Sequence, residues 1–212
     1  MRSEMEVGSN IYSALYLAAH TLFSDAKTRV GPHAIVLLTD GQDSGLKLSW
    51  NPATMQAAPG SNQLAFEDVV RELSSLDAEV FEISTENRPK GMTATWLDAH
   101  ADATLVSRDS RRLEIPAYTL FLAELVRRTG GDLEFLRELG TLSDAYRRVV
   151  SIIRAEYSLG FYSDSTGWQP GWHNLKIGFS DPQAQAAARL HCRSSYYVPH
   201  RERSASGELV PQ

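Results

Sequence analysis

Apolar residues follow helical and strand periods in turn along the first two thirds of the chain. They recur at helical spacing over Asn10–Phe23, behind the capping sequence Gly8-Ser9-Asn10. An unbroken apolar run of strand length, HAIVLLT, occupies residues 33–39. Helical spacing returns over Gln63–Leu76, and EVFEIS at residues 79–84 is a second strand candidate. Strand, helix and strand in this order predict a βαβ unit.

The HAIVLLT run is typical of a strand buried on both faces, and therefore of a parallel sheet covered by helices. Three further elements continue the pattern: a helix at Tyr118–Thr129 ended by Gly130-Gly131, a strand at Asp132–Leu136 and a helix at Leu142–Glu156. We therefore expect residues 1–156 to form an α/β domain, a doubly wound and mostly parallel sheet with flanking helices. The segment Thr85–Pro116 has no clear pattern.

The last third of the chain changes character at about Tyr157. Three segments there alternate apolar and polar residues between turn signals, namely YSLGFY, GWHNLKIGF and RLHCRSSYYV. They predict a C-terminal antiparallel β appendage over residues 157–199, and the polar residues 200–212 are expected to form a disordered tail. The many aromatic residues of the appendage either pack it onto the domain, which we favour, or form a surface for a partner.

Composition and charge exclude several classes of protein. Of the 212 residues, 42% are hydrophobic and 22% are charged, which argues against disorder over the whole length. The net charge is −5 without a block of like charges, so we expect no nucleic-acid partner. No apolar run approaches the ~18 residues that span a bilayer, so we expect no membrane insertion, and the first residues resemble no signal peptide. A single cysteine, Cys192, leaves the compartment undetermined.

The most informative local motif is Thr-Asp-Gly at the end of the HAIVLLT strand. A strand that ends this way places Asp40 at the carboxyl edge of the sheet, where open α/β folds bind their ligands. Gly41 lets the backbone turn away, and a hard carboxylate oxygen suits Mg²⁺ or Mn²⁺. The equally weighted alternative is that Asp40 only caps a turn. The polar loop Asp40–Asn62 is longer than most passive connections, which favours a functional role.

Several segments, in their order along the chain, resemble one family. They are VGSNIYSALYLA, HAIVLLTDGQDSG, EVFEIS, LAELVRRTGGDLEFL and the ending with YSLGFY, GW…IGF and SSYYVP. Together they cover about residues 7–199 and resemble the von Willebrand factor type A-related proteins of acidobacteria and their relatives. The resemblance implies a doubly wound α/β fold with a metal-ion-dependent adhesion site. In that site, a divalent cation receives an acidic group of a partner protein.

The resemblance also assigns residues to the site. Ser9 matches a hydroxyl ligand of the family, where Thr is usual, and Asp40 matches an acidic ligand. Asn10, Gly41 and Asp43 lie at the ligand-binding rim, although Asp43 is more simply interpreted as a solvating residue of the loop. The family's DxSxS motif and the first strands have no counterpart before Ser9. We therefore expect Mg²⁺ or Mn²⁺ to bind weakly and through waters, and the chain to be an N-terminally truncated copy.

Spacing argues against other chemistry. The six histidines and Cys192 fit no zinc pattern, and no phosphate-binding glycine motif occurs. A hydrolase using Ser44 or Asp40 stays open, although the chain has no G-x-S-x-G elbow and no D-x-D pair. The arginine pairs at 111–112, 127–128 and 147–148 are expected to be solvated.

Three functions follow from these patterns. The preferred hypothesis is a non-catalytic adhesion module that binds an unidentified protein partner through a cation held by Asp40 and Ser9. The second is a metal-dependent hydrolase that uses Asp40. The third is a truncated remnant that pairs its exposed apolar strand with another chain, including a second copy of itself as a homo-oligomer. Family members of greater length look exported, and the chain itself carries no signal that fixes its localisation.

Overall fold

A parallel sheet of three strands forms the centre of the α/β body. The strands are β1 (His33–Thr39), β2 (Ala78–Ser84) and β3 (Leu133–Phe135), in the order β1-β2-β3. Both strand pairs are parallel, and β1 faces β2 over its full length from His33↔Ala78 to Thr39↔Ser84. The computed structural model describes residues 9–23, 33–43, 64, 66–93, 96, 115–136, 138–161, 169–187, 190–198, 201–203 and 209–211.

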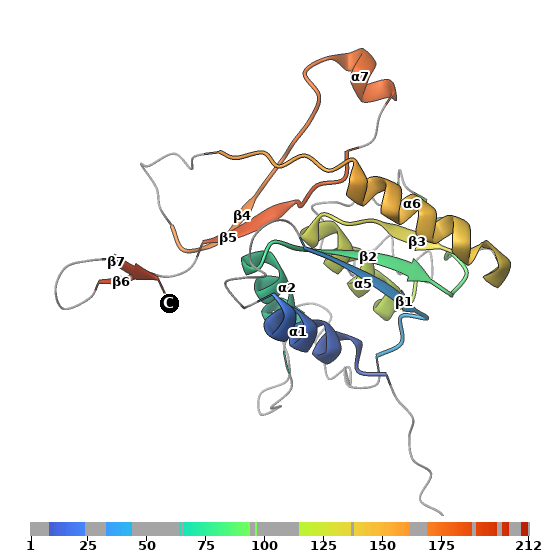
Figure 1. Cartoon of the computed structure of the whole chain (residues 1–212), viewed down its shortest axis with the longest axis horizontal. Coiled ribbons are helices and arrows are strands. Elements are labelled where there is room, and N and C mark those ends of the chain that lie inside the picture. Colours follow the sequence, from blue (N-terminus) through green and yellow to red (C-terminus); the bar gives the residue numbers. More distant parts are fainter. Residues whose placement is uncertain are drawn as a thin grey trace, which may run out of the picture.

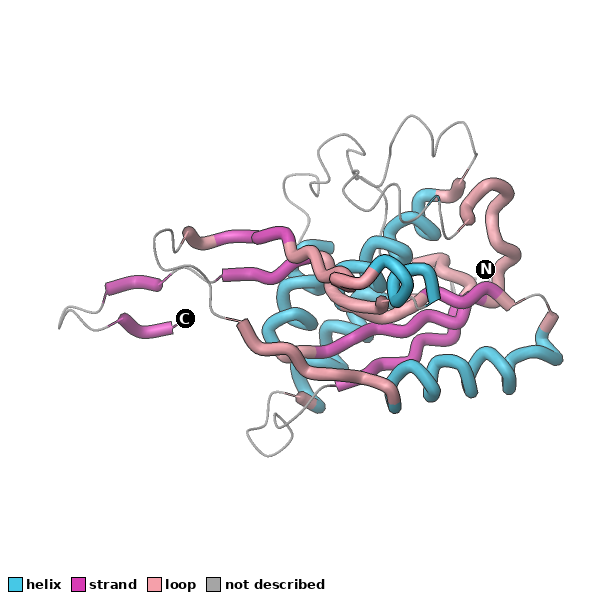
Figure 2. Tube along the Cα trace, turned by 90° about the horizontal axis from the view of Figure 1, so that it is seen from above, coloured by secondary structure: helices cyan, strands magenta, loops and turns pink. Residues whose placement is uncertain are grey.

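Helices cover both faces of this sheet, as the sequence pattern predicts (Figure 1, Figure 2). The helices of the larger layer are α1 (Ile11–Leu22), α2 (Phe66–Ser75) and α5 (Ala117–Thr129). Their apolar faces share one core with Ala78 and Val80 of β2. On the opposite face, α6 (Leu142–Arg154) packs Ala145 and Val149 against Phe81 and Ile83. None of the described helices has the length and apolar character needed to cross a lipid bilayer.

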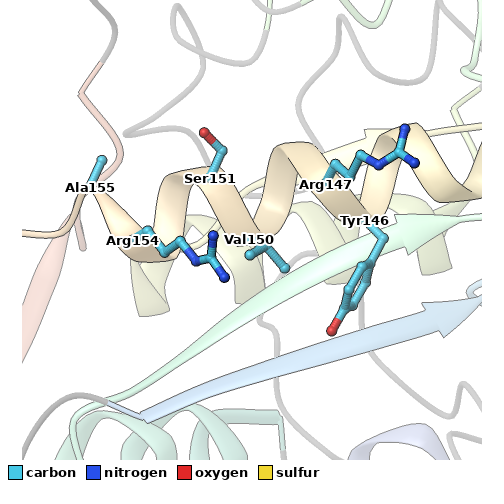
Figure 3. Close-up of a pocket in the computed structure, with 6 residues that line it drawn as sticks. All are labelled: Tyr146, Arg147, Val150, Ser151, Arg154 and Ala155. Atoms are coloured by element: carbon cyan, nitrogen blue, oxygen red, sulfur yellow. The ribbon is translucent and has the colours of Figure 1, made fainter.

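The prediction that HAIVLLT is buried on both faces is wrong. Exposure alternates along β1, and Val36 and Leu38 are 38% and 52% exposed. The physical reason is the position of β1 at the edge of the sheet, because α6 packs on Phe81 and Ile83 of β2 and leaves the same face of β1 uncovered. Figure 3 shows side chains of α6 that point toward the strands on this side.

The helix boundaries agree closely with the sequence pattern. Helix α5 ends at Gly130, which has φ +98° and donates its backbone N–H to Val126 O at 3.0 Å. This is the left-handed glycine cap expected at a helix C-terminus. The predicted loop Asp40–Asn62 and the segment Thr85–Pro116 lie partly outside the described residues, which there are 40–43, 85–93, 96, 115 and 116.

The C-terminal part contains a separate antiparallel sheet. It consists of β4 (Gly171–Asn174) and β5 (Ser195–Val198), and a short helix, α7 (Pro182–Ala187), lies between them in the sequence. Two of the three predicted segments therefore supply strands, whereas residues 157–161 are exposed and pair with no strand in the described part of the chain. Where the sequence predicts a disordered tail, β6 (Arg201–Arg203) pairs with β7 (Leu209–Pro211).

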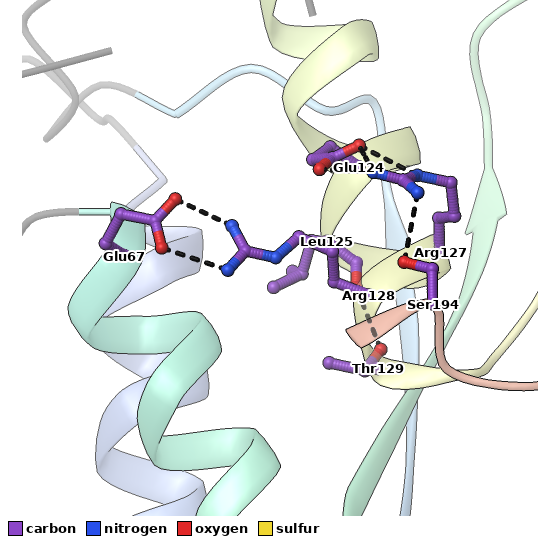
Figure 4. Close-up of polar contacts among 7 residues, drawn as sticks. All are labelled: Glu67, Glu124, Leu125, Arg127, Arg128, Thr129 and Ser194. Atoms are coloured by element: carbon purple, nitrogen blue, oxygen red, sulfur yellow. Dashed lines mark hydrogen bonds and ion pairs between the residues drawn. The ribbon is translucent and has the colours of Figure 1, made fainter. Parts of the chain in front are cut away.

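Arg128 joins the appendage to the body, which corrects the prediction that the pair Arg127-Arg128 is solvated. The Arg128 guanidinium donates to both carboxylate oxygens of Glu67, at 2.6 and 3.0 Å, as Figure 4 shows. It also lies over the Trp172 ring of β4, at 4.1 Å from the ring centroid. Arg127 in turn donates to Ser194 at 3.0 Å. The aromatic ring of Trp172 thus packs the appendage against the body.

We expect Arg128→Ala to lower the free energy of unfolding by about 2 kcal/mol, because it removes a nearly buried bidentate ion pair and a cation–π contact. The Arg128 side chain is 10% exposed, and the Glu67 side chain, at 41%, can be partly solvated after the change. Urea unfolding provides the measurement. The control is Arg147→Ala, since Arg147 pairs with Asp144 on the surface with 76% exposure and should contribute less than about 0.5 kcal/mol. Equal losses in the two variants would contradict the role assigned to Arg128.

Candidate functional site at the carboxyl edge of the sheet

The predicted site residues lie where the carboxyl end of β1 meets the start of α1. Asp40 and Gly41 follow β1 directly, and Ser9 and Asn10 immediately precede α1. The backbone N–H of Thr85 donates to Thr39 O at 2.8 Å, which extends the pairing of the two strands to this edge. Ligands of open α/β sheets bind in this position.

A hydrogen bond connects the loop after β1 to the first turn of α1. The backbone N–H of Tyr12 donates to Asp43 Oδ2 at 3.0 Å, across 31 residues of sequence. Asn10, at the N-cap, makes no side-chain capping bond, so the carboxylate of Asp43 acts in its place. A carboxylate at this helix end also interacts favourably with the helix dipole. Asp43 therefore positions the loop against α1. This role differs from both interpretations of Asp43 drawn from the sequence, the ligand-binding rim and the solvated loop.

Gly41 allows the loop to pass close to α5. Its φ is +86°, a backbone conformation that residues with a Cβ rarely adopt. A Cβ at this position would also lie 3.1 Å from side-chain carbons of Leu122 and Tyr118. The N–H of Gly41 donates to Thr39 Oγ1 at 3.0 Å. The loop is thus held between α1 and α5, as expected for a glycine that turns the backbone away from the strand.

Asp40 is exposed at this edge. Its Oδ1 accepts a hydrogen bond from the N–H of Gln42 at 3.1 Å, which is the turn-capping contact of the structural alternative. Ser9 is exposed as well, and the described residues contain no hydrogen bond between Ser9 and Asp40. The structure therefore brings together Asp43 and the start of α1, and it places Asp40 and Ser9 on the two segments that this contact joins.

Asp40 and Ser9 are the side chains of the predicted site that could hold a divalent ion, which would then keep most of its waters. Among the described residues, no group of three or more histidine, cysteine, aspartate or glutamate side chains could enclose a metal. Asp40 supplies a hard carboxylate oxygen and Ser9 a hydroxyl, and Mg²⁺ commonly binds through one or two carboxylates with several waters. A closed protein site for Zn²⁺ would need more ligands than these.

Negative charge gathers around this edge. Burial raises the pKa of Tyr118, and the carboxylates of Glu86 and Asp40 raise it further. The pKa of Tyr12 is also raised, first by burial and then by Glu82 and Asp43. Burial is the largest cause for both tyrosines, and the carboxylates of Asp40, Asp43 and Glu86 add negative charge near this edge.

Glu82 and the hydroxyl of Tyr12 are polar groups that sequence reasoning does not single out. Glu82 lies on β2 and is 2% exposed, and burial raises its pKa to about 8. Its Oε2 and the Tyr12 hydroxyl have no hydrogen-bond partner in the described part of the chain. The sequence signal that could identify Glu82 is its position between Phe81 and Ile83. A strand covered by helices on both faces leaves no solvated position for a glutamate.

Comparison with known proteins adds no relative, since no family model, no curated protein and no solved structure matches the chain.

Proposed function

We propose that this chain is a non-catalytic protein-binding module related to the von Willebrand factor type A domains. In this proposal, Asp40 and Ser9 hold Mg²⁺ or Mn²⁺ weakly at the carboxyl edge of the sheet. The ion receives an acidic group of a partner protein at one of its water positions.

The observation that carries the proposal is the hydrogen bond from the Tyr12 N–H to Asp43. Because Asp43 is three residues after Asp40 and Tyr12 is three after Ser9, this bond holds the two ligand-bearing segments at one edge. The carboxylates of Asp40, Asp43 and Glu86, which add to the effect of burial on the pKa of Tyr12 and Tyr118, support a cation there.

The exposure of Asp40 supports binding rather than hydrolysis. Hydrolytic use of this carboxylate needs a base or acid within hydrogen-bond reach of the reacting group. The structure describes four histidines, and each has a place or a contact other than Asp40. His33 lies at the opposite end of β1, His20 contacts Glu72, His173 contacts the Gln169 carbonyl oxygen, and His191 lies 3.6 Å from Asp132. A partner group bound from solvent needs only an accessible ion, which an exposed residue can present.

We expect Mg²⁺ or Mn²⁺ to raise the melting temperature of the wild-type chain relative to EDTA, and Asp40→Asn to abolish that shift. A ligand that binds only the folded state stabilises it by about 0.4 kcal/mol at a concentration equal to its Kd and by about 2.7 kcal/mol at a hundred times its Kd, so the ion is titrated upward from millimolar concentration. Thermal melts followed by circular dichroism provide the measurement.

Asp181→Asn is the matched control for this experiment. Asp181 is exposed, and its Oδ1 accepts a hydrogen bond from the N–H of Gln183 at 2.9 Å, so it repeats the local turn of Asp40 away from the sheet edge. This variant should keep the full ion-dependent shift. The proposal fails if the wild type shows no shift, or if the shift survives Asp40→Asn.

A further inference from the structure

The outer edge of β1 carries backbone groups that its own sheet does not use. The N–H of His33 donates to Asp77 O at 3.2 Å, and the carbonyl of Thr39 accepts from Thr85 at 2.8 Å. Both residues therefore point their backbone groups toward β2. Because this direction alternates along a strand, Ile35 and Leu37 also point toward β2, whereas the backbone groups of Ala34, Val36 and Leu38 point away from the sheet.

The side chains along this edge make it suitable for pairing. Ala34, Val36 and Leu38 also form the face that α6 leaves uncovered, and Val36 and Leu38 are 38% and 52% exposed. The strand HAIVLLT contains no lysine, proline, aspartate or glutamate, which are the residues that natural edge strands use to prevent pairing. Within the described residues, β1 has β2 as its one strand neighbour.

We infer that two copies of this chain pair antiparallel through the outer edges of their β1 strands and form a symmetric dimer with one continuous sheet. The inference does not depend on the cation site of the proposed function, because the paired edge runs along the side of the sheet.

The register of this pairing follows from the three outward residues. With Val36 opposite the partner's Val36, Ala34 lies opposite the partner's Leu38, so each small side chain faces a large one. In this register, every outward N–H and C=O of both strands finds a partner across the two-fold axis. A two-fold interface requires such a self-complementary patch, which a three-residue edge centred on Val36 provides.

Charges at the ends of β1 favour the same register. The antiparallel arrangement places His33 opposite the partner's Thr39. The two Asp40 carboxylates therefore lie at opposite ends of the paired strands and do not repel each other. A parallel arrangement would instead bring the two Asp40 carboxylates together, with like-charge repulsion.

The flank of α6 provides apolar surface beside the paired strands. Tyr146 and Val150 lie one helical turn apart, and Figure 3 shows them pointing from α6 toward the strands. They line a pocket of about 520 Å³, and Tyr146 is 53% exposed. Pairing adds the partner's Val36 and Leu38 to this face and so enlarges the apolar surface next to the pocket.

Sedimentation velocity of the full chain, from low micromolar to several hundred micromolar, tests the inference. We expect the wild type to form a dimer, and Val36→Lys to raise the dimer Kd by at least about tenfold, because two lysines then meet at the two-fold axis. Leu22→Lys is the control, since Leu22 of α1 is 59% exposed and is not part of the strand that pairs. It should leave the dimer Kd unchanged, and circular dichroism verifies that each variant is folded.

Amide hydrogen exchange locates the interface without any substitution. The outward amides of Ala34, Val36 and Leu38 should exchange more slowly as protein concentration rises, whereas the amides of Ile35 and Leu37, already bonded to β2, should not respond. A wild type that stays monomeric over the whole range overturns the inference. It is equally overturned by a dimer that persists in folded Val36→Lys, or by outward amides whose exchange is independent of concentration.

Discussion

Replacing Glu82 with glutamine should abolish a large part of the pH dependence of stability. Burial raises the pKa of Glu82 to about 8 from an ordinary value of 4.5, so the folded chain holds a proton that the unfolded chain releases. Stability attributable to Glu82 is therefore complete below about pH 4.5 and is lost as the pH rises through 8. By linkage, this loss is on the order of 5 kcal/mol in total, of which about 4 kcal/mol falls between pH 5 and pH 9. Glutamine does not ionise, so the stability of the Glu82→Gln variant should not fall in this way as the pH rises.

Urea unfolding of both proteins at about pH 5 and about pH 9 measures this effect. At each pH, the unfolding free energy of Glu82→Gln is subtracted from that of the wild type. The readout is the change in this difference from pH 5 to pH 9. A buried amide left without partners lowers stability equally at both pH values, so it cancels in this comparison. Glu79, whose pKa is raised to about 7 mainly by burial, adds a slope of the same sign to both proteins. Parallel pH profiles for wild type and Glu82→Gln would refute the prediction.

Local signals explain which elements the sequence predicts well. Helical periodicity and the Gly130 cap depend on residues a few positions apart, and α1, α5 and α6 are found within three residues of their predicted ends. The extended pattern of residues 157–161 is equally local, yet a strand exists only when another strand lies beside it. Alternation of apolar residues therefore identifies candidates for strands without identifying their partners.

Burial of β1 illustrates the same limit, although the exposed apolar strand of the third hypothesis agrees with its edge position. Its apolar run correctly predicts a strand of the parallel sheet, but burial on both faces depends on neighbours elsewhere in the chain. The site residues behave similarly. Asp40 and Gly41 can be placed from the strand that precedes them, whereas the capping role of Asp43 depends on a helix 31 residues away. Arg128 reaches its partner Glu67 across 61 residues, so its sequence neighbours carry no sign of burial.

Gly131→Ala should be the most damaging small substitution in the body of the chain. An ideal Cβ at Gly131 would overlap the carbonyl group of Val80 and approach Phe81 N to 3.2 Å, so the backbone of β2 or of the turn before β3 must move. We expect a loss of about 3 kcal/mol in unfolding free energy, because packing against rigid backbone leaves no side chain to rearrange. For a domain of this size, the melting temperature should fall by roughly 10 °C.

Gly140→Ala is the matched control, because it makes the same change of one methyl group where a Cβ meets nothing within 4 Å. Neither Gly131 nor Gly140 has a positive φ, so the comparison isolates steric overlap from backbone conformation. Gly140→Ala should leave stability unchanged or raise it by less than about 1 kcal/mol, through the lower entropy of the unfolded chain. If the two variants melt together, the close approach of Gly131 to β2 does not exist. If only Gly131→Ala is destabilised, this glycine is required for β3 to reach β2.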